Sequence, residues 1–312
     1  MQVLRSISEL SSIRAPIVLA IGVFDGLHRG HQSVLRRAMQ EAAIADGIAV
    51  PLTFDPHPAR ILSPDKAPLL LTGQEHKMHL LSDMGFSHAL VLPFTADVAA
   101  TEASDFITSL ATSSHRLTAI CVGQRWSFGK GRKGNLNLLQ ELGPTHGFGA
   151  IGVTELTEIE DPVSSTRVRQ AVAAGDFPLA QTLLGRPYAV LGTVIEGRRL
   201  GRTLGFPTAN LTLFNEQLPP PGVYAVKARR ISRGSPIDGI ANLGFRPTLG
   251  EEETAPTLEV HLFEFNDDCY GELLEIEFVR FLRAEQKFPD LNRLSDQIKV
   301  DKEHALSVLA KS

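Results

Sequence analysis

Two patterns of apolar and polar residues divide the chain. In the first part, short apolar runs alternate with segments whose apolar residues recur at helical spacing. The runs span residues 17–23, 48–54, 89–92, 119–122 and 149–153. Uninterrupted apolar runs of this length are typical of strands buried on both faces, and their alternation with helices favours a parallel sheet. The pattern therefore predicts a doubly wound α/β domain, with helices on both faces of the sheet.

The pattern changes after Leu184. Gly185, Arg186 and Pro187 interrupt the chain, and the segments that follow alternate apolar and polar residues between turn residues. These segments span residues 188–196, 223–229, 239–243, 258–265 and 273–281. Short strands at this spacing predict an all-β domain, a closed antiparallel β-barrel, and helical spacing over 291–309 predicts a terminal helix packed against it. We expect an α/β domain over residues 1–185 and an all-β domain over residues 186–312.

Length and composition agree with two domains and exclude few partners. At 312 residues each domain can bury its own core. The formal net charge of -4 gives no electrostatic reason to expect a nucleic acid or an anionic membrane as partner. The apolar run over 15–24 is too short to cross a bilayer and lacks a signal-peptide cleavage pattern, so we expect a cytoplasmic protein. Cys121 and Cys269 lie outside any metal-binding spacing and are expected to be small buried side chains. The oligomeric state stays open.

The segment after the first predicted strand has the features of a phosphate site. Residues 24–31 read Phe-Asp-Gly-Leu-His-Arg-Gly-His and begin a helix. The first turn of a helix offers free N–H groups and a favourable dipole to phosphate, and Gly30 lets the backbone approach an anion. His28 and His31 can donate hydrogen bonds to the charge that develops during phosphoryl transfer. Asp25 fits either a turn-stabilising residue or a group oriented at the site. The candidate nucleotide-binding residues here are Gly22, Phe24, Asp25, Gly26 and Gly30.

Three further segments add to this site. Residues 55–58 follow the second predicted strand and residues 123–134 follow the fourth. Ligands of doubly wound sheets bind beyond the carboxyl ends of the strands. These two segments should therefore meet residues 24–31 at one edge of the sheet. Residues 164–169, Ser-Ser-Thr-Arg-Val-Arg, open another helix. A serine there fits an ordinary N-cap, whereas Arg169 one turn later adds a guanidinium suited to a polyphosphate.

Together these motifs resemble the nucleotidyltransferase superfamily that carries H-x-G-H and S-S-T-x-x-R. Residues 53–58 and 128–134 are similar, more narrowly, to the adenylyltransferase half of the bifunctional bacterial riboflavin kinase/FAD synthetase family. The resemblance implies a nucleotidyltransferase-like fold in which the phosphate of FMN attacks the α-phosphate of ATP and releases pyrophosphate. It implies that His28 and His31 face the reacting phosphates, and that the pyrophosphate is held by Ser164, Ser165, Thr166 and Arg169, with Mg²⁺. It also implies flavin contacts from Asp55, His57, Pro58, Arg125, Trp126 and Phe128.

One part of the motif departs from the family. The family pattern is roughly V-G-x-D-F-x-F-G, whereas residues 122–129 read Val-Gly-Gln-Arg-Trp-Ser-Phe-Gly, and Asn135 stands where Asp is common. A cation in place of an acidic or amide residue changes the hydrogen bonds that the pocket can make. Trp126 fits a core or stacking replacement for Phe. The alternative function is therefore a riboflavin kinase with an adenylyltransferase domain impaired by Arg125 and Trp126.

A second resemblance covers the barrel. Residues 192–210 are rich in glycine and arginine and can wrap a phosphate with backbone N–H groups, although glycine-rich hairpin loops are common. The last four residues of this segment are Pro207, Thr208, Ala209 and Asn210, and they are similar to the riboflavin kinase half of the same family. The similarity extends through the following segments: residues 218–224, 241–248, 258–261, 270–271 and 282–288. Without that resemblance, Glu259 is a charged residue on an exposed strand face. His261 shares that face and lies either near the site or in solvent.

The kinase resemblance assigns roles to several residues. Thr208 would bind the Mg²⁺ that bridges the ATP phosphates, Asn210 would support the same cluster, and Glu259 would take the proton from the riboflavin 5′-hydroxyl. The further nucleotide contacts are Gly197, Arg198, Gly201, Gly205 and Pro207, and the flavin contacts are Arg283 and Phe288. The sequence thus predicts a bifunctional enzyme with ATP as co-substrate, Mg²⁺ as cofactor, and riboflavin, FMN and FAD as substrates and products. Small molecules are the expected partners, with no nucleic acid and no membrane.

Overall fold

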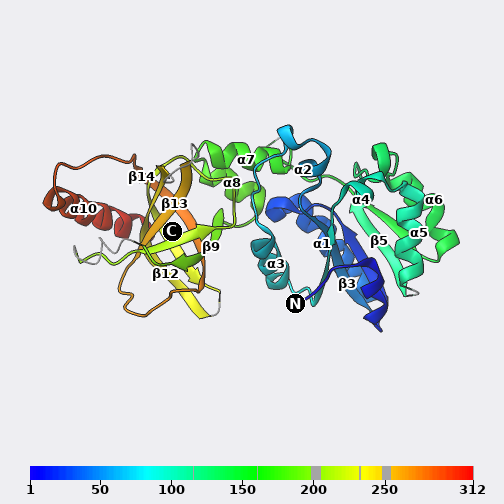
Figure 1. Cartoon of the computed structure of the whole chain (residues 1–312). Helices are drawn as coiled ribbons and strands as arrows, with labels where there is room; N and C mark the ends of the chain where they lie inside the picture. Colours follow the sequence, from blue (N-terminus) through cyan, green and yellow to red (C-terminus); the bar gives the residue numbers. More distant parts are fainter. Residues whose placement is uncertain (115, 160, 198–204, 232, 248–253, 312) are drawn as a thin grey trace. The chain divides into compact units, whose positions relative to one another are not determined.

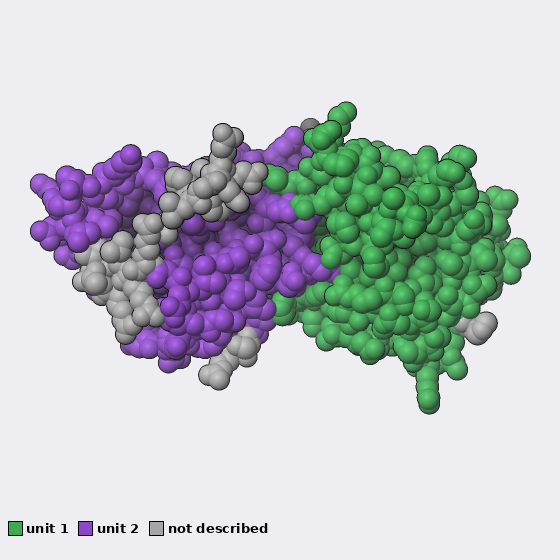
Figure 2. All heavy atoms as spheres, in the orientation of Figure 1, with its two compact units in different colours: residues 1–69, 77–165 green, residues 70–76, 166–312 purple. Residues whose placement is uncertain are grey.

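The computed structural model of the chain describes residues 1–114, 116–159, 161–197, 205–231, 233–247 and 254–311. They form two compact units (Figure 2). The first comprises residues 1–69 and 77–165, and the second comprises residues 70–76 and 166–312. The short segment 70–76 therefore belongs with the second half of the chain, although it lies within the sequence of the first.

The first unit contains a parallel sheet of six strands, coloured blue to green in Figure 1. The strand order is β1-β4-β3-β2-β5-β6, and every paired strand runs parallel to its neighbour. The strands are β1 (Gln2–Leu4), β2 (Ile17–Ile21), β3 (Ile48–Asp55), β4 (His88–Pro93), β5 (Leu117–Gly123) and β6 (Gly149–Val153). The five predicted strands are confirmed, and β1 is an addition of three residues, too short for its pattern to be read from sequence.

Alternate residues of β2 enter different hydrophobic cores. Ile17, Leu19 and Ile21 join one cluster, while Val18 and Ala20 join the other. Since successive side chains of a strand point to opposite faces, the sheet is covered on both sides, and the prediction of a doubly wound domain is confirmed. The helices of this part are α1 (Arg29–Ile44), α2 (Pro58–Leu62), α3 (Gln74–Asp83), α4 (Ala96–Ala100), α5 (Ala103–Ser113) and α6 (Leu136–His146), with short 3-10 turns η1 (Ile7–Ser12), η2 (Asp25–Leu27), η3 (Pro64–Lys66) and η4 (Lys130–Arg132). A two-stranded ribbon of β7 (Thr157–Glu158) and β8 (Asp161–Pro162) follows β6.

The second unit contains a closed antiparallel barrel with the order β10-β13-β12-β11-β14-β9. Its strands are β9 (Ala189–Ile195), β10 (Ala209–Leu213), β11 (Gly222–Arg230), β12 (Arg233–Pro247), β13 (Thr254–Leu262) and β14 (Leu273–Arg283). The predicted barrel is confirmed. The strand missing from the prediction is β10, which follows the glycine-rich segment and has only five residues.

Among its described residues, the second unit also contains α7 (Ser165–Ala173), whose first residue belongs to the first unit, α8 (Phe177–Leu184) and α10 (Leu291–Leu309), which is red in Figure 1. Phe177 of α8 stacks on Phe278 of β14 with ring centroids 5.8 Å apart. Ala305 and Leu309 of α10 share a hydrophobic core with strand residues of the barrel. The predicted terminal helix over 291–309 is confirmed in position and length.

The cysteines differ in environment. Cys121 lies buried in β5, as expected, whereas Cys269 is partly exposed in the loop after β13. The expectation of burial was wrong for Cys269 because the loop that carries it borders a cavity rather than the core. Among the described residues, no helix is both long enough and apolar enough to span a membrane.

Candidate active sites

The turn after β2 places a strained backbone beneath the predicted phosphate site. Phe24 has φ 54° and Leu27 has φ 41°, in the left-handed region that non-glycine residues rarely adopt. Both side chains are buried. Their burial offsets the strain, because a buried apolar side chain of this size is worth roughly 1.5–3 kcal/mol. Gly22, Asp25 and Gly26 are buried in the same turn.

Two side chains from neighbouring elements hold this turn. Thr53 on β3 donates a hydrogen bond of 2.8 Å to the Val23 carbonyl, and the Lys77 Nζ on α3 donates one of 3.0 Å to the same oxygen. Lys77 is buried, and burial lowers its pKa, while the charges of Asp25 and Asp55 act in the opposite direction. Sequence reasoning missed Lys77, because it stands in a polar stretch of a helix and resembles an exposed residue.

The two histidines lie together at the start of α1. His28 caps the helix, and its Nδ1 accepts the backbone N–H of His31 at 3.3 Å. The imidazole rings stack with centroids 3.6 Å apart, and the Phe24 ring packs edge-on against His31 at 5.4 Å. A Cβ at position 30 would lie 3.3 Å from the His28 ring and would crowd it, so glycine leaves room for that ring. Both imidazoles are thus held at a helix N-terminus, where the dipole favours an anion.

The serine motif reaches the same turn. The Ser165 hydroxyl donates a hydrogen bond of 2.9 Å to the Asp25 carbonyl, and Arg29 forms an ion pair with Glu158. Ser164 is partly buried directly before α7. Thr166 and Arg169 follow on α7, and they belong to the second unit. The structure therefore brings Ser165 to the histidine turn.

The loop after β3 carries three of the candidate flavin residues. Asp55 ends the strand and is exposed. His57 caps α2, with its Nδ1 accepting the N–H of Ala59 at 3.1 Å, and Pro58 is the first residue of that helix. Since β3 is a direct neighbour of β2, this loop leaves the same edge of the sheet as the histidine turn.

The loop after β5 carries the other three candidate flavin residues of the α/β unit. Arg125 pairs with Glu155 at 2.8 Å and is 77% exposed. Trp126 stacks on Phe128 with centroids 4.4 Å apart, and it packs against the hydrophobic core on one face of the sheet. Because β5 borders β2 on the side opposite β3, the three loops leave one edge of three adjacent strands. The predicted convergence is confirmed.

The second site begins with a row of paired residues around the barrel. Asn210 on β10 is paired with Glu259 on β13, which is paired with Asn242 on β12. The row continues through Val223 on β11 to Arg283 on β14. Residues paired across antiparallel strands share a face, so these five side chains, from five strands, belong to one surface of the barrel.

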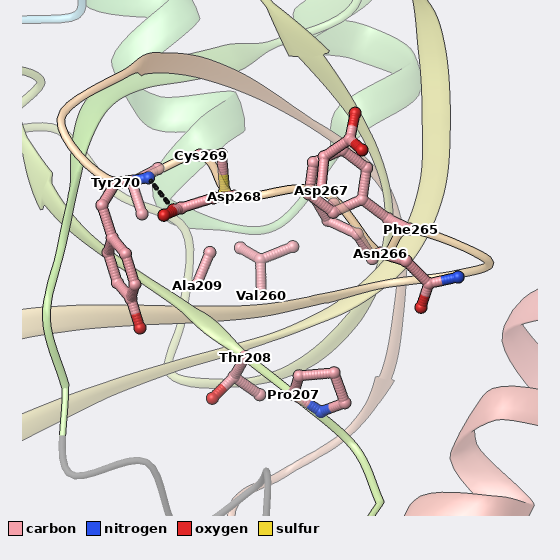
Figure 3. A pocket seen from close by; sticks show the side chains of 12 residues that line it. Pro207, Thr208, Ala209, Val260, Phe265, Asn266, Asp267, Asp268, Cys269 and Tyr270 are labelled. Carbon is pink, nitrogen blue, oxygen red and sulfur yellow. Dashed lines mark hydrogen bonds between the residues drawn. The ribbon is translucent and has the colours of Figure 1, made fainter.

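Two cavities meet at Thr208. One, of ≈ 430 Å³, is lined by Pro207, Thr208 and Ala209, by buried strand residues that include Val260, and by the loop 265–270 (Figure 3). The other, of ≈ 350 Å³, is lined by Thr208, Glu259, Arg283 and Phe288 and by residues of α10. Thr208 is common to both. Glu259 therefore borders a cavity rather than open solvent.

His261 fixes the strand next to Thr208. It is buried, and burial lowers its pKa. Its Nδ1 lies 2.8 Å from the Pro207 carbonyl, which can only accept, so the ring donates this hydrogen bond. The interpretation of His261 as a solvated residue was wrong, because the ring is enclosed between Phe206 and Phe263.

The glycine-rich segment is described only in part. Arg198 and Gly201 lie outside the described residues. Gly197 lies against Asn210, where a Cβ would come 2.1 Å from the Asn210 Nδ2. Gly205 precedes Phe206 at the other end of the segment. At Arg283, the guanidinium lies 5.7 Å from the centre of the Phe288 ring, so these two predicted flavin residues are in contact.

Comparison with known proteins matches each unit to a different family. Residues 10–167 match the family described as FAD synthetase, and residues 184–309 match the family described as riboflavin kinase. A protein of Escherichia coli (strain K12), named bifunctional riboflavin kinase/FMN adenylyltransferase, is 38% identical over 304 residues, covering 96% of each chain. The chain belongs to the bifunctional riboflavin kinase/FMN adenylyltransferase family.

Other relatives of the same name agree. The one from Bacillus subtilis (strain 168) is 38% identical and covers 94% of this chain and 92% of its own. The one from Haemophilus influenzae is 36% identical over 98% of both chains. A crystal structure described as a macrolide-efflux protein from Streptococcus pneumoniae superimposes with a TM-score of 0.81, at 28% identity, over 97% of this chain and 98% of that one. That name describes a different activity, and the family assignment rests on the sequence matches.

Membership in the bifunctional family bears on the altered loop at 122–129. Matches to both halves favour the bifunctional interpretation over the kinase-only alternative. In the structure, Trp126 stacks on Phe128, and the Arg125 side chain pairs with Glu155.

Two side chains of the barrel unit offer oxygen ligands to a hard cation such as Mg²⁺. Thr208 directly precedes β10 and Asn210 is the second residue of that strand, so a hydroxyl and an amide oxygen stand two residues apart at its start. Gly197 lies close to the Asn210 amide and leaves no room for a side chain between them. Within the described ranges, no cluster of three or more His, Cys, Asp or Glu side chains is arranged for a metal. These two residues fit a Mg²⁺ that takes its other ligands from phosphate and water.

Several residues at the bifunctional enzyme's sites were not found from sequence. Asn242 joins the row beside Glu259 and donates a hydrogen bond of 3.0 Å to Glu285. Asp267 and Tyr270 line the larger cavity, as Cys269 does. Asn242 and Tyr270 lie in segments that resemble the family, but the sequence assigned them no role in a site, because their place depends on how the strands and the loop after β13 come together.

Proposed function

We propose that this chain phosphorylates riboflavin to FMN in the barrel unit and transfers the adenylyl group of ATP to FMN in the α/β unit. The two family matches and the names of the full-length relatives support both activities. The observation that carries the kinase step is the meeting of two cavities at Thr208, with Glu259 in the second. The observation that carries the adenylyl step is the stacked histidine pair at the N-terminus of α1.

In the kinase step, the riboflavin 5′-hydroxyl would lie in the smaller cavity beside Glu259, and the triphosphate would enter from the larger one past Thr208. Glu259 accepts the hydroxyl proton as the oxygen bonds to the γ-phosphorus, and the bond from that phosphorus to the β-phosphate oxygen breaks, which releases ADP. A carboxylate is sufficient for this role, because phosphoryl transfer demands mainly positioning and charge stabilisation. His261 positions Pro207 and thereby Thr208. Arg283 and Phe288 contact the flavin ring.

In the adenylyl step, a phosphate oxygen of FMN bonds to the α-phosphorus of ATP, and the bond to the β-phosphate oxygen breaks. His28 and His31 donate hydrogen bonds to the phosphates, and Ser164, Ser165, Thr166 and Arg169 hold the departing pyrophosphate. No covalent enzyme intermediate is required. The flavin ring lies at the loops after β3 and β5, with contacts from Asp55, His57, Pro58, Arg125, Trp126 and Phe128.

Mg²⁺ would neutralise part of the triphosphate charge in both steps, and Thr208 and Asn210 would hold it in the kinase unit. The remaining nucleotide contacts of the proposal are Gly22, Phe24, Asp25, Gly26 and Gly30 in the first unit, and Gly197, Arg198, Gly201, Gly205 and Pro207 in the second. We assign adenylyl transfer to residues 1–185 and phosphorylation to residues 186–312. Both reactions consume ATP, so we place the enzyme in the cytoplasm, with small molecules as its partners.

The proposal is tested by incubating the purified chain with riboflavin, ATP and Mg²⁺ and separating the flavins by chromatography. FMN should appear first and FAD should follow, with pyrophosphate released in equal amount to FAD. FMN without FAD would support the kinase-only alternative. Riboflavin that stays unchanged, together with FMN that is not converted when it is supplied, would overturn the proposal.

A further inference from the structure

Asp301 is a buried charge on the apolar face of α10. Ile298, Ala305 and Leu309 of this helix pack against the barrel. Asp301 stands three residues after Ile298 and four before Ala305, so it shares their face. Its side chain is only 5% exposed. A carboxylate taken out of water in this way is costly unless charged and hydrogen-bonding partners surround it.

The partner is Arg283 at the end of β14. The Arg283 Nε lies 2.9 Å and 3.0 Å from the two carboxylate oxygens of Asp301, and the Nη2 lies 2.7 Å from Oδ2. Gln297, one turn earlier on α10, donates a further hydrogen bond of 2.9 Å to Oδ1. The pair is therefore a two-pronged contact in which the plane of the guanidinium is fixed by the carboxylate.

Arg283 is restrained on its other sides as well. Its Nη1 donates a hydrogen bond of 3.0 Å to the Ala284 carbonyl, and the guanidinium lies over the Phe288 ring. Arg283, Phe288 and Asp301 all line the cavity that contains Glu259. The guanidinium is thus held in one orientation in the wall of this cavity, at the end of the row that begins at Asn210.

A purely structural role explains this pair poorly. A well-packed apolar pair generally fastens a helix at least as firmly as a buried ion pair, because the ions lose their hydration. What an ion pair supplies in addition is orientation. The guanidinium has five N–H donors. Among the described residues, three of them are used: that of Nε and one of Nη2 at Asp301, and one of Nη1 at the Ala284 carbonyl. A planar group with carbonyl acceptors, such as the isoalloxazine ring, fits the remaining donors and the flat face.

We propose that Asp301 is a positioning residue of the flavin cavity, which orients the Arg283 guanidinium toward the isoalloxazine ring and so sets the affinity for riboflavin. This inference rests on the proposed kinase function. Asp301 acts through Arg283, so its loss should weaken flavin binding more than it slows phosphoryl transfer.

The test compares Asp301→Asn, Arg283→Ala and the double variant in the full chain, with steady-state kinetics for riboflavin. Asp296→Asn is the matched control, because Asp296 lies on the same helix with a side chain 69% exposed. Asp301→Asn should raise the KM for riboflavin about 10-fold and change kcat less than about 3-fold, since a charged hydrogen-bonding partner is lost. In the Arg283→Ala background, Asp301→Asn should have no further effect on KM.

An unchanged KM for riboflavin in Asp301→Asn would overturn the inference. So would a double variant whose KM exceeds that of Arg283→Ala by the full factor that Asp301→Asn causes alone. Arg283→Lys is a second test in case the Asp301 variants misfold. Lysine keeps the positive charge but lacks the two-pronged hydrogen bonding of the guanidinium. It should raise the KM for riboflavin by a similar factor, and an unchanged KM would also overturn the inference. Lack of kinase activity in the unaltered chain would instead contradict the proposed function.

Discussion

The two sites use different parts of the fold to arrange their chemistry. In the α/β unit, the groups lie on loops at one edge of three adjacent parallel strands, and the turn that carries Phe24 and Leu27 has a strained backbone. In the barrel unit, Asn210, Glu259 and Arg283 lie on the strands themselves, in one row of paired positions. The first arrangement depends on the conformation of contiguous segments. The second depends on the register of strands that are far apart in the sequence.

The largest expected effect is on the rate of FMN formation, from a substitution that disables only the barrel site. Glu259→Gln should lower the rate of FMN formation by about 10²- to 10⁴-fold, because the amide cannot accept the hydroxyl proton. FAD formation from supplied FMN should persist. Parallel assays of the two steps check this, with Glu303→Gln, an exposed glutamate on α10, as the matched control. A parallel loss of both activities would argue against separate sites.

His31→Ala should have the reverse effect. Loss of one donor to a developing charge costs about 10²- to 10³-fold, so FAD formation should fall by that factor while riboflavin phosphorylation continues. His88→Ala is the control, because His88 begins β4 and so lies at the amino edge of the sheet, away from the loops. The same two assays report the result, and unimpaired FAD formation would remove the histidine stack from the mechanism.

These two sites also differ in how far sequence alone could predict them. His28, Gly30 and His31 lie within one stretch of four residues shortly after an apolar run, so both their chemistry and their place at a helix start could be predicted. Lys77 and Asp301 could not be, because each stands among polar residues of a helix and only tertiary packing buries it. The pairing of Asn242 with Glu259 needs the register of β12 and β13. Glu259 itself was assigned through a family resemblance rather than from its local pattern.

A third change tests how closely Gly197 packs against Asn210, the first residue in the row of paired residues around the barrel. Gly197→Ala would place a Cβ 2.1 Å from the Asn210 Nδ2, so the amide must move. We expect the kinase rate to fall about 10-fold or more, comparable to losing a supporting contact of a metal ligand. Adenylyl transfer should be unchanged. Gly149→Ala is the matched control, because its Cβ would meet only the Thr118 carbonyl at 3.8 Å. Activity equal to that of the control would show that Asn210 tolerates displacement.

Acid should weaken the barrel unit through His76. This buried ring lies 3.0 Å from Glu275, and burial lowers its pKa below the usual 6.5. Burial alone would raise the pKa of Glu275, but hydrogen bonds from His76 and Arg229 outweigh it and lower that pKa to about 2. Below pH 6.5 the unfolded chain binds a proton at His76 that the folded chain does not, so stability falls as pH falls. One proton gives a slope of about 1.4 kcal/mol per pH unit.

Chemical unfolding followed between pH 7.5 and 5.5 measures this slope. His76→Gln should flatten it, whereas His304→Gln, an exposed histidine on α10, should not. The carboxylate of Glu275 contributes in the same direction at lower pH, between about 4.5 and about 2. If the slope is the same in His76→Gln, the ring titrates alike in the folded and unfolded chains, and the barrel has no such sensitivity.

The smallest effect concerns the altered loop of the α/β unit. Arg125 is 77% exposed and pairs with Glu155, and exposed ion pairs contribute about 0–1 kcal/mol. Arg125→Ala should therefore change the rate of adenylyl transfer and the KM for FMN by less than about 3-fold. Steady-state kinetics with FMN measure both. A large gain in FAD formation would show that Arg125 impairs this site, as the kinase-only alternative requires.

The central claim is that two separate sites act in sequence, one in each unit. It is tested most directly by mixing the Glu259→Gln and His31→Ala proteins with riboflavin, ATP and Mg²⁺ and measuring FAD. Neither protein alone should form FAD from riboflavin, whereas the mixture should form it after a lag, because FMN released by the His31→Ala protein is used by the Glu259→Gln protein. A mixture that accumulates no FAD, or a single variant that forms FAD from riboflavin at the unaltered rate, would contradict the claim.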